Sequence, residues 1–180
     1  MIRAFKQMVD EGLTDWQLRL AGSVEPGPVH EQYFQKVISA IQGYPITVDT
    51  NIPFDNLKQL LGESSIYWHA TGYGVDPQKA PEKMEHFGIT TVEAMMSRCV
   101  PVAINLGGQP EIVTTGKTGF LWDSVEELMG FTWKLIQQPE LLDKMSTAAQ
   151  IDAQKYDDSI FFDTLRRLIF RYPDTAPITG

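Results

Sequence analysis

The sequence predicts an α/β fold: a doubly wound, Rossmann-like parallel sheet with helices on both faces and extra helices near the carboxyl end. The first observation is that apolar residues alternate between strand spacing and helical spacing from residue 1 to about residue 138. The second is the segment VPVAI, residues 100–104, which is apolar on both faces, as a buried parallel strand should be. The third is a glycine that ends each of three helical segments, at Gly12, Gly43 and Gly62.

The individual elements follow from this spacing in chain order. The first helix carries its apolar residues three or four positions apart, at Ile2, Phe5, Met8 and Val9. The expected strands are residues 16–22, 45–48, 65–70, 100–104 and 119–122. The expected later helices are residues 29–42, 54–61, 88–97, 124–138, 140–155 and 159–171, the fifth helix along the chain opening with a capping box of Ser124 and Glu127.

The length of 180 residues suits one domain with a core of its own. We expect that domain to cover residues 1–172, followed by a tail at residues 173–180 that contains two prolines and a glycine. A doubly wound sheet normally starts with a strand, whereas this chain starts with a helix. The sequence therefore suggests that the chain begins inside a larger protein.

The composition excludes several classes of protein. Asp and Glu total 23 against 15 Lys and Arg, a net charge of −8, which disfavours nucleic-acid binding because that needs a basic face. The single cysteine, Cys99, allows no internal disulfide and fits a reducing compartment. There is no signal peptide and no apolar run near the roughly 18 residues of a membrane span.

The stretch EHFGITTVE places one glutamate before an expected helix and a second inside it. The first backbone N–H groups of that helix, from Gly88 to Thr90, have no intrahelical partner and sit at the positive end of the helix dipole, where phosphates bind. Glu85 and Glu93 flank this end and can accept hydrogen bonds from hydroxyl groups. A hydroxyl acceptor at Glu85, a phosphate site at the helix N-terminus and a second hydroxyl acceptor at Glu93 would suit a nucleotide diphosphate sugar. The alternative is that both glutamates are solvated surface residues.

Residues 85–122 resemble the donor-binding half of the retaining group 1 glycosyltransferases, also called family 4. The family pattern E-x-F-G-(x)4-E-A-M appears here as Glu85, Phe87-Gly88 and Glu93-Ala94-Met95. It continues through an apolar strand into Gly107-Gly108, Glu111-Ile112-Val113, Gly116 and Gly119-Phe120-Leu121. Weaker similarity extends upstream to the first helix and downstream to about residue 150.

The resemblance implies a role for each matched residue. Glu85, as the catalytic residue, would hold hydroxyls of the donor sugar near the anomeric carbon. Phe87, Gly88 and Ile89 would offer backbone N–H groups to that sugar, Thr90 would contact the diphosphate, and Glu93 would bind the ribose diol. The implied reaction retains the anomeric configuration and needs no cofactor and no obligatory metal. No Asp-x-Asp pair and no His/Cys cluster is present in the sequence.

The resemblance also implies a larger protein of the GT-B fold, in which two doubly wound domains face a cleft. This chain would be the C-terminal, donor-binding half. The N-terminal acceptor domain, and a first strand with the Arg and Lys that contact the diphosphate, would precede residue 1. The fragment alone would then be inactive. Its expected location is the cytoplasm or, in a full-length protein, the cytoplasmic face of a membrane.

Three further positions have two interpretations each. Gly107 and Gly108 either bring backbone close to the donor or form a turn that needs positive φ. His69, at the end of an expected strand, either lines the cleft or is a structural histidine, and no role is assigned to His86. The loop 71–84 is longer than in many family members and is either a flap over the donor or a surface loop.

Two rival functions stay open at this point. One is an enzyme that uses a soluble sugar acceptor, of the sucrose- or glycogen-synthase kind. The other is a non-catalytic α/β nucleotide-binding or interaction module that keeps only the fold. The base, the sugar and the acceptor cannot be read from the sequence.

Overall fold

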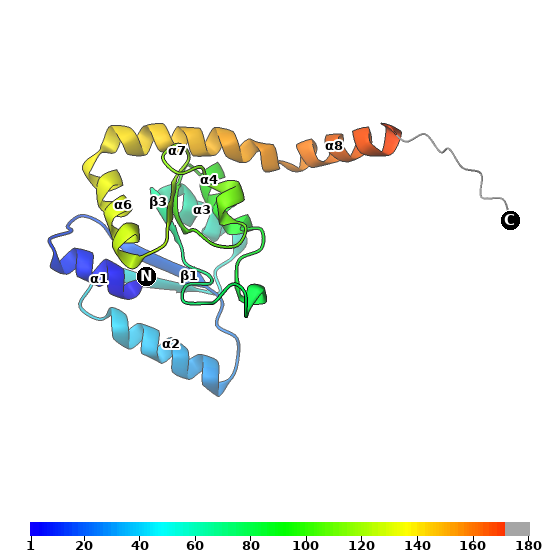
Figure 1. Cartoon of the computed structure of the whole chain (residues 1–180). Helices are drawn as coiled ribbons and strands as arrows, with labels where there is room; N and C mark the ends of the chain where they lie inside the picture. Colours follow the sequence, from blue (N-terminus) through cyan, green and yellow to red (C-terminus); the bar gives the residue numbers. More distant parts are fainter. Residues whose placement is uncertain (172–180) are drawn as a thin grey trace.

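The computed structural model describes residues 1–171 and has an α/β architecture with parallel strands and helices packed around them (Figure 1). All strand pairing is parallel, so the expected fold class is confirmed. The expected tail at residues 173–180 lies outside the described residues.

The five strands found within residues 1–171 form two separately hydrogen-bonded sheets. Strands β1 (Leu18–Gly22) and β2 (Ile46–Thr50) make the first sheet. The second has the order β3-β4-β5, with β3 at Ile66–His69, β4 at Val100–Ile104 and β5 at Phe120–Trp122. We expected one continuous sheet. The difference arises because no strand of the described residues joins β1 to β3.

The seven expected helices are present within about two residues of their expected bounds, and there are three short additions within residues 1–171, at Pro81–Lys83, Gln109–Ile112 and Gln154–Tyr156. The helix that we expected to end at Gly62 runs on to Glu63. In chain order they are α1 (Ile2–Asp10), α2 (Pro28–Ile41), α3 (Phe54–Glu63), η1 (Pro81–Lys83), α4 (Ile89–Met96), α5 (Gln109–Ile112), α6 (Val125–Gln137), α7 (Pro139–Ala153), η2 (Gln154–Tyr156) and α8 (Asp158–Arg171). The capping box is present at α6, because the Glu127 N–H donates to Ser124 Oγ at 3.2 Å and the Glu127 carboxylate accepts from the Asp123 N–H at 2.8 Å.

A cavity of about 960 Å³ lies between the two sheets, and residues 17–23 and 64–71 line it along the full length of β1 and β3. Hydrogen bonds to the neighbouring strand show which edge of each strand is free. The Leu18 N–H donates to Pro45 on the β2 side. Because backbone groups alternate along a strand, those of Arg19 and Ala21 point toward the cavity instead.

The β3 edge is free in the same way. The Val100 N–H donates to the Ser65 carbonyl, so the backbone groups of every second residue of β3, counted from Ser65, point toward β4. The backbone groups of Ile66 and Trp68 therefore point toward the cavity from the opposite side. Among the described residues, the two strand edges that border the space between the sheets are therefore unpaired.

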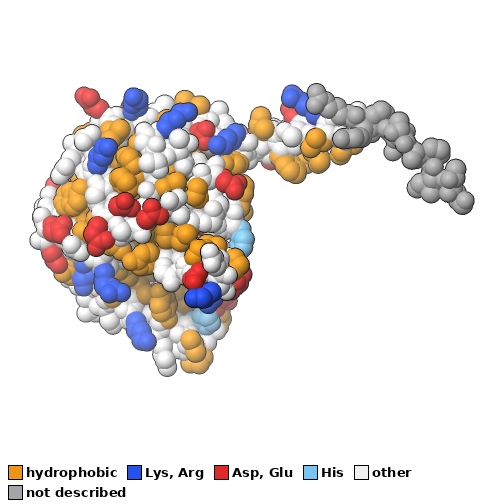
Figure 2. Space-filling model, in the orientation of Figure 1, with side chains coloured by type: hydrophobic (Ala, Val, Ile, Leu, Met, Phe, Trp, Pro, Cys, Tyr) orange, Lys and Arg blue, Asp and Glu red, His pale blue; other side chains and the backbone are white. Residues whose placement is uncertain are grey.

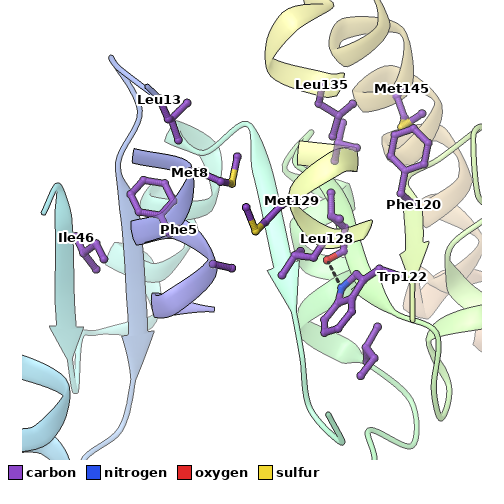
Figure 3. Close-up of a cluster of buried hydrophobic side chains, with 14 residues drawn as sticks. Phe5, Met8, Leu13, Ile46, Phe120, Trp122, Leu128, Met129, Leu135 and Met145 are labelled. Atoms are coloured by element: carbon purple, nitrogen blue, oxygen red, sulfur yellow. Dashed lines mark hydrogen bonds between the residues drawn. The ribbon is translucent and has the colours of Figure 1, made fainter. Parts of the chain in front are cut away.

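The main core fills the space between β4, β5 and their covering helices. Figure 3 shows Leu128 and Trp122 there, and Trp122 donates its indole N–H to the Val102 carbonyl at 3.2 Å. The same cluster continues through Met129 and Met8 to Phe5 and Ile46 on the side of β1 and β2. Fully burying one large apolar side chain contributes about 1.5–3 kcal/mol to folding. The largest side chains under 2 % exposed in this cluster are Trp122, Met8, Leu128, Leu135, Met145, Val100 and Val102.

Helices α7 and α8 differ in how they are covered. Helix α7 packs against α4, α6 and β4, whereas α8 extends away from the body, its main contact being with η2 at its own start (Figure 1). Apolar side chains are visible along that projecting helix (Figure 2), and seven of them are exposed: Ile160, Phe161, Phe162, Leu165, Leu168, Ile169 and Phe170. Among the described residues, no helix has the length and apolar character needed to cross a bilayer.

Candidate functional site

The site is built around the N-terminus of α4, which begins directly after a left-handed residue. Gly88 is the N-cap with φ +86° and ψ +47°, and no side chain of its own can cap the helix. A Cβ at this position would also lie 2.5 Å from Gln109 Nε2, so both the backbone conformation and the available space disfavour a side chain. Any other residue would be strained in this conformation and would have to displace the Gln109 side chain.

Glu85 supplies the cap that Gly88 lacks. Its Oε1 accepts from the Gly88 N–H at 3.1 Å and, more weakly, from the Phe87 N–H at 3.4 Å. A carboxylate at the positive end of a helix is stabilised by the dipole. Of the amides that we expected to face a ligand, the Gly88 amide is therefore already occupied by Glu85 in this structure.

The next two amides of α4 are open. The N–H groups of Ile89 and Thr90 have no hydrogen-bond acceptor within residues 1–171, whereas those of Thr91 and Val92 both donate to the Gly88 carbonyl. Two free amides at a helix N-terminus form a suitable place for an anion. The Thr90 hydroxyl stands beside them and accepts from the Tyr67 hydroxyl at 2.8 Å.

Glu93 lies one turn further along α4, about 6 Å along the axis from Ile89. It is half-buried and lines the intersheet cavity together with Thr90, Tyr67 and His69. Its carboxylate makes no hydrogen bond or ion pair with any other described residue. Both of its oxygens are available to hydroxyl donors that enter the cavity.

Tyr67 is a site residue that the sequence analysis missed. It lies on β3 two positions before His69, so the two side chains share one face of the strand, with ring centroids 6.5 Å apart. Burial raises the pKa of Tyr67, and the charges of Glu85 and Glu93 raise it further. The hydrogen bonds of the Tyr67 hydroxyl with Thr90 and Thr91 oppose this rise only in part. The sequence did contain a signal for this residue: Tyr67 lies two residues before His69 on a strand that ends at the site, so both side chains are on the same face.

His69 is placed at the carboxyl end of β3, where it is 5 % exposed. Its Nε2 is 3.9 Å from Glu85 Oε2, beyond hydrogen-bonding distance, and neither ring nitrogen has a partner among the described residues. Burial lowers the pKa of His69, and the Glu85 charge opposes that shift only in part. This lowered pKa favours the neutral imidazole.

Gly107 and Gly108 pack directly against the backbone of the loop that carries Glu85. A Cβ on Gly107 would lie 2.1 Å from the Glu85 carbonyl oxygen, and one on Gly108 would lie 2.3 Å from the His86 carbonyl oxygen. The Gly108 N–H also donates to the Glu85 carbonyl at 2.8 Å. The close approach that these glycines allow is to the protein's own backbone, and the φ of +60° at Gly107 fits the expected turn.

The remaining parts of this loop are also attached to the body. The Phe87 ring is half-exposed and meets the Tyr156 ring edge-on, with centroids 5.6 Å apart. The Tyr73 ring lies 5.6 Å from that of Trp122. Of these two contacts, the one made by Tyr73 lies within residues 71–84, and it favours a surface loop over a free flap there.

The structure thus brings some expected site residues together and separates others. His69, Thr90 and Glu93 line one cavity, while Glu85 reaches His69 from outside the lining. Gly107 and Gly108 support the loop from behind. Within residues 1–171, no group of three or more His, Cys, Asp or Glu side chains has the arrangement of a metal site.

Comparison with known proteins gives matches along most of the chain. Residues 1–152 match the family described as glycosyl transferases group 1. A GDP-Man:Man(3)GlcNAc(2)-PP-Dol alpha-1,2-mannosyltransferase of Dictyostelium discoideum is 32% identical over 119 residues, which are 66% of this chain and 21% of that protein. The alpha-1,3/1,6-mannosyltransferase ALG2 of Mus musculus is 30% identical over 146 residues, 71% of this chain and 34% of the relative.

Two solved structures have a similar fold. Anabaena HepE in complex with UDP-glucose superimposes with a TM-score of 0.74 at 19% identity, over 94% of this chain and 45% of the other. Sucrose-phosphate synthase of Thermosynechococcus elongatus gives a TM-score of 0.70 at 18% identity, over 94% and 41%. The chain spans about a fifth to a third of these curated relatives and less than half of these solved chains.

Proposed function

Since the chain belongs to the group 1 glycosyl transferases, we propose that it is the donor-binding domain of a retaining glycosyltransferase. Its substrate is a nucleotide diphosphate sugar, and the transferred group is a hexose. The arrangement that supports this most directly is the N-terminus of α4. There the free amides of Ile89 and Thr90 lie between Glu85 on one side and Glu93 on the other.

Each group at this helix end has a proposed task. The diphosphate is bound by the Ile89 and Thr90 amides and the Thr90 hydroxyl, with the helix dipole favouring its charge. Glu93 accepts hydrogen bonds from the ribose diol. Glu85 holds hydroxyls of the sugar through Oε2, because Oε1 already caps α4. Fixed donors next to a leaving diphosphate stabilise the charge that develops on it. We also propose that the reaction has no obligatory metal.

Two classes of hexose donor are favoured by the relatives. The Dictyostelium relative is by name a GDP-mannose enzyme, and the Anabaena structure holds UDP-glucose. We therefore place GDP-mannose and UDP-glucose first among the candidates. We also propose that the acceptor surface belongs to another domain, that residues 1–180 alone do not transfer sugar, and that the full-length enzyme works in the cytoplasm or at the cytoplasmic face of a membrane.

The first test is a binding screen with this chain. A thermal-shift series with GDP, UDP and ADP and their sugars identifies the base, and amide NMR shifts then locate the contact. We expect the amides of Ile89 and Thr90 to shift, with Kd values in the millimolar range, about −4 kcal/mol. Saturating nucleotide without a shift at either amide contradicts the proposal.

The second test separates the two glutamates. Glu93→Ala removes an acceptor for the ribose diol, and we expect it to weaken nucleotide and nucleotide sugar alike, by roughly 10- to 150-fold. Glu85→Ala should leave free nucleotide diphosphate binding closer to that of the parent and weaken the sugar-specific part. Glu82→Ala, an exposed glutamate in η1, is the matched control. Equal losses of nucleotide affinity at positions 85 and 93 would contradict the assigned roles.

A further inference from the structure

We propose that His69 is a positioning residue for Glu85: its neutral imidazole donates from Nε2–H to Glu85 Oε2 and so sets the direction of the carboxylate. This inference rests on the proposed function for its purpose, because it makes His69 the residue that prepares Glu85 for the sugar. The first observation is the geometry of the pair. His69 Nε2 and Glu85 Oε2 face each other at 3.9 Å, one atom from the end of β3 and the other from the loop before α4.

The second observation is the state of the His69 ring. A neutral imidazole carries one N–H and one lone pair, and both are normally satisfied when the ring is buried. At 5 % exposure, His69 has no hydrogen-bond partner for either nitrogen within the described residues. The nearest carboxylate oxygen is that of Glu85, and a movement of about 1 Å brings it to an ordinary N–H···O distance.

The third observation is the asymmetry of the Glu85 carboxylate. Oε1 is held by the Gly88 and Phe87 amides, which fixes one end of the group. Oε2 is therefore the carboxylate oxygen that can still change position, and the Glu85 side chain is one-third exposed. A donor at Oε2 stops rotation about the carboxylate axis, so the remaining lone pair of Oε2 points in one direction. Glu85 then presents a single oriented acceptor to a hydroxyl of the sugar.

The fourth observation is where this pair lies. His69 lines the intersheet cavity together with Thr90 and Glu93, so the ring borders the space in which the ligand is proposed to sit. Tyr67, on the same face of β3, makes its own hydrogen bond to Thr90 and does not compete for Glu85. Consecutive positions on one strand face therefore support the two ends of the site, Tyr67 at the amides and His69 at the carboxylate.

The first experiment needs no ligand. Long-range ¹H–¹⁵N NMR spectra of the chain report the tautomer of each imidazole, with exposed His30 and His86 as internal references. We expect His69 to carry its proton on Nε2 and its ring shifts to change in Glu85→Gln, while Glu82→Gln leaves them unchanged. A proton on Nδ1, or ring shifts that do not respond to Glu85→Gln, would overturn the proposal.

The second experiment compares a sugar nucleotide with its free nucleotide. The two candidate pairs are GDP-mannose with GDP and UDP-glucose with UDP, and the pair that binds the parent chain is used. We measure how much tighter the sugar nucleotide binds than the free nucleotide. His69→Phe should lower that ratio about tenfold, the same as Glu85→Gln, and the double variant should lose no more. His69→Gln, which keeps an N–H near the Nε2 position, should restore most of the ratio.

Several results of this second experiment count against the proposal. An unchanged ratio in His69→Phe is one of them, and additive losses in the double variant are another. A third is an equal loss of affinity for the nucleotide and for the sugar nucleotide, because that is what a purely structural histidine would give. Binding of neither pair by the parent chain would overturn the proposed function instead. The ligand-free spectra would then still decide whether His69 and Glu85 are coupled.

Discussion

Strands β4 and β1 are both parallel and both five residues long, yet they occupy opposite environments. Every residue of β4 is buried, whereas none of β1 is. Strand β4 has a strand on each side and helices on each face, and β1 has a strand on one side and the cavity on the other. The comparison teaches that burial in this fold is set by the number of strand neighbours as much as by the apolar content of the strand itself.

The largest expected effect separates the core around β4 from the surroundings of β1. Leu135→Ala removes a fully buried side chain that packs in the β4–β5 core. We expect a loss of about 2–5 kcal/mol in the free energy of unfolding, because a cavity remains. Leu20→Ala, at a half-buried position of β1, should cost about 1 kcal/mol. Urea unfolding of both variants measures this, and equal losses would remove the distinction between the two regions.

The second effect compares a glycine that follows β4 with the glycine that is the last residue of β1. Gly107, after β4, has φ +60° and would place a Cβ 2.1 Å from the Glu85 carbonyl, whereas a Cβ on Gly22, at the end of β1, meets nothing within 4 Å. We expect Gly107→Ala to destabilise the chain by about 1–3 kcal/mol and to shift the amide signals of Phe87 and Gly88. Gly22→Ala should change stability by less than about 0.5 kcal/mol. Intact Gly88 signals in Gly107→Ala would mean that the loop is not held from behind.

The third effect asks whether β1 can be converted into an inner strand. An added segment of five apolar residues, joined to Met1 by a short glycine linker, is long enough at about 16 Å to lie between β1 and β3. We expect hydrogen exchange at the amides of Arg19, Ala21 and Trp68 to slow at least about tenfold. The control extension has prolines at alternate positions and cannot pair. Equal exchange in both extended chains would show that the cavity does not accept a strand.

The smallest effect concerns pH and the histidine at the end of β3. Burial lowers the pKa of His69 below that of the unfolded chain, near 6.5. The unfolded state therefore binds the proton first, and stability falls as the pH drops below about 6.5. We expect His69→Phe to lose less stability than the parent between pH 7.5 and 5.5, measured by urea unfolding. The exposed control His86→Asn should behave as the parent does, and a parent with no decline over that range would contradict the shift.

The sequence predicts the elements of the second half of the chain well for a physical reason. Strand β4 matches its expected bounds because a uniformly apolar run of five residues between turn signals has few other interpretations. Helix α5 was missed because four residues are too few to display a helical period. The division into two sheets also could not be predicted, since pairing between β1 and any other strand depends on contacts far apart in the sequence.

The candidate site was predictable in its positions and less so in its contacts. The pattern around Glu85 and Glu93 located the N-terminus of α4 correctly, to within one residue. The capping of α4 by Glu85 depends on a loop conformation that is set by Gly107 and Gly108, which lie some twenty residues downstream. The role of Tyr67 depends on a partner 23 positions away. Local spacing carries no information about either contact.

The two glutamates differ in what keeps them in the sequence during evolution. Glu85 closes the end of α4 whether or not a sugar is ever bound, so a descendant that had lost its activity would still have a reason to retain it. Glu93 makes no hydrogen bond or ion pair within residues 1–171, and its retention would have to come from a ligand. In comparisons among related genes, the second glutamate is therefore the more informative marker of a working enzyme, and the first is a marker of the fold.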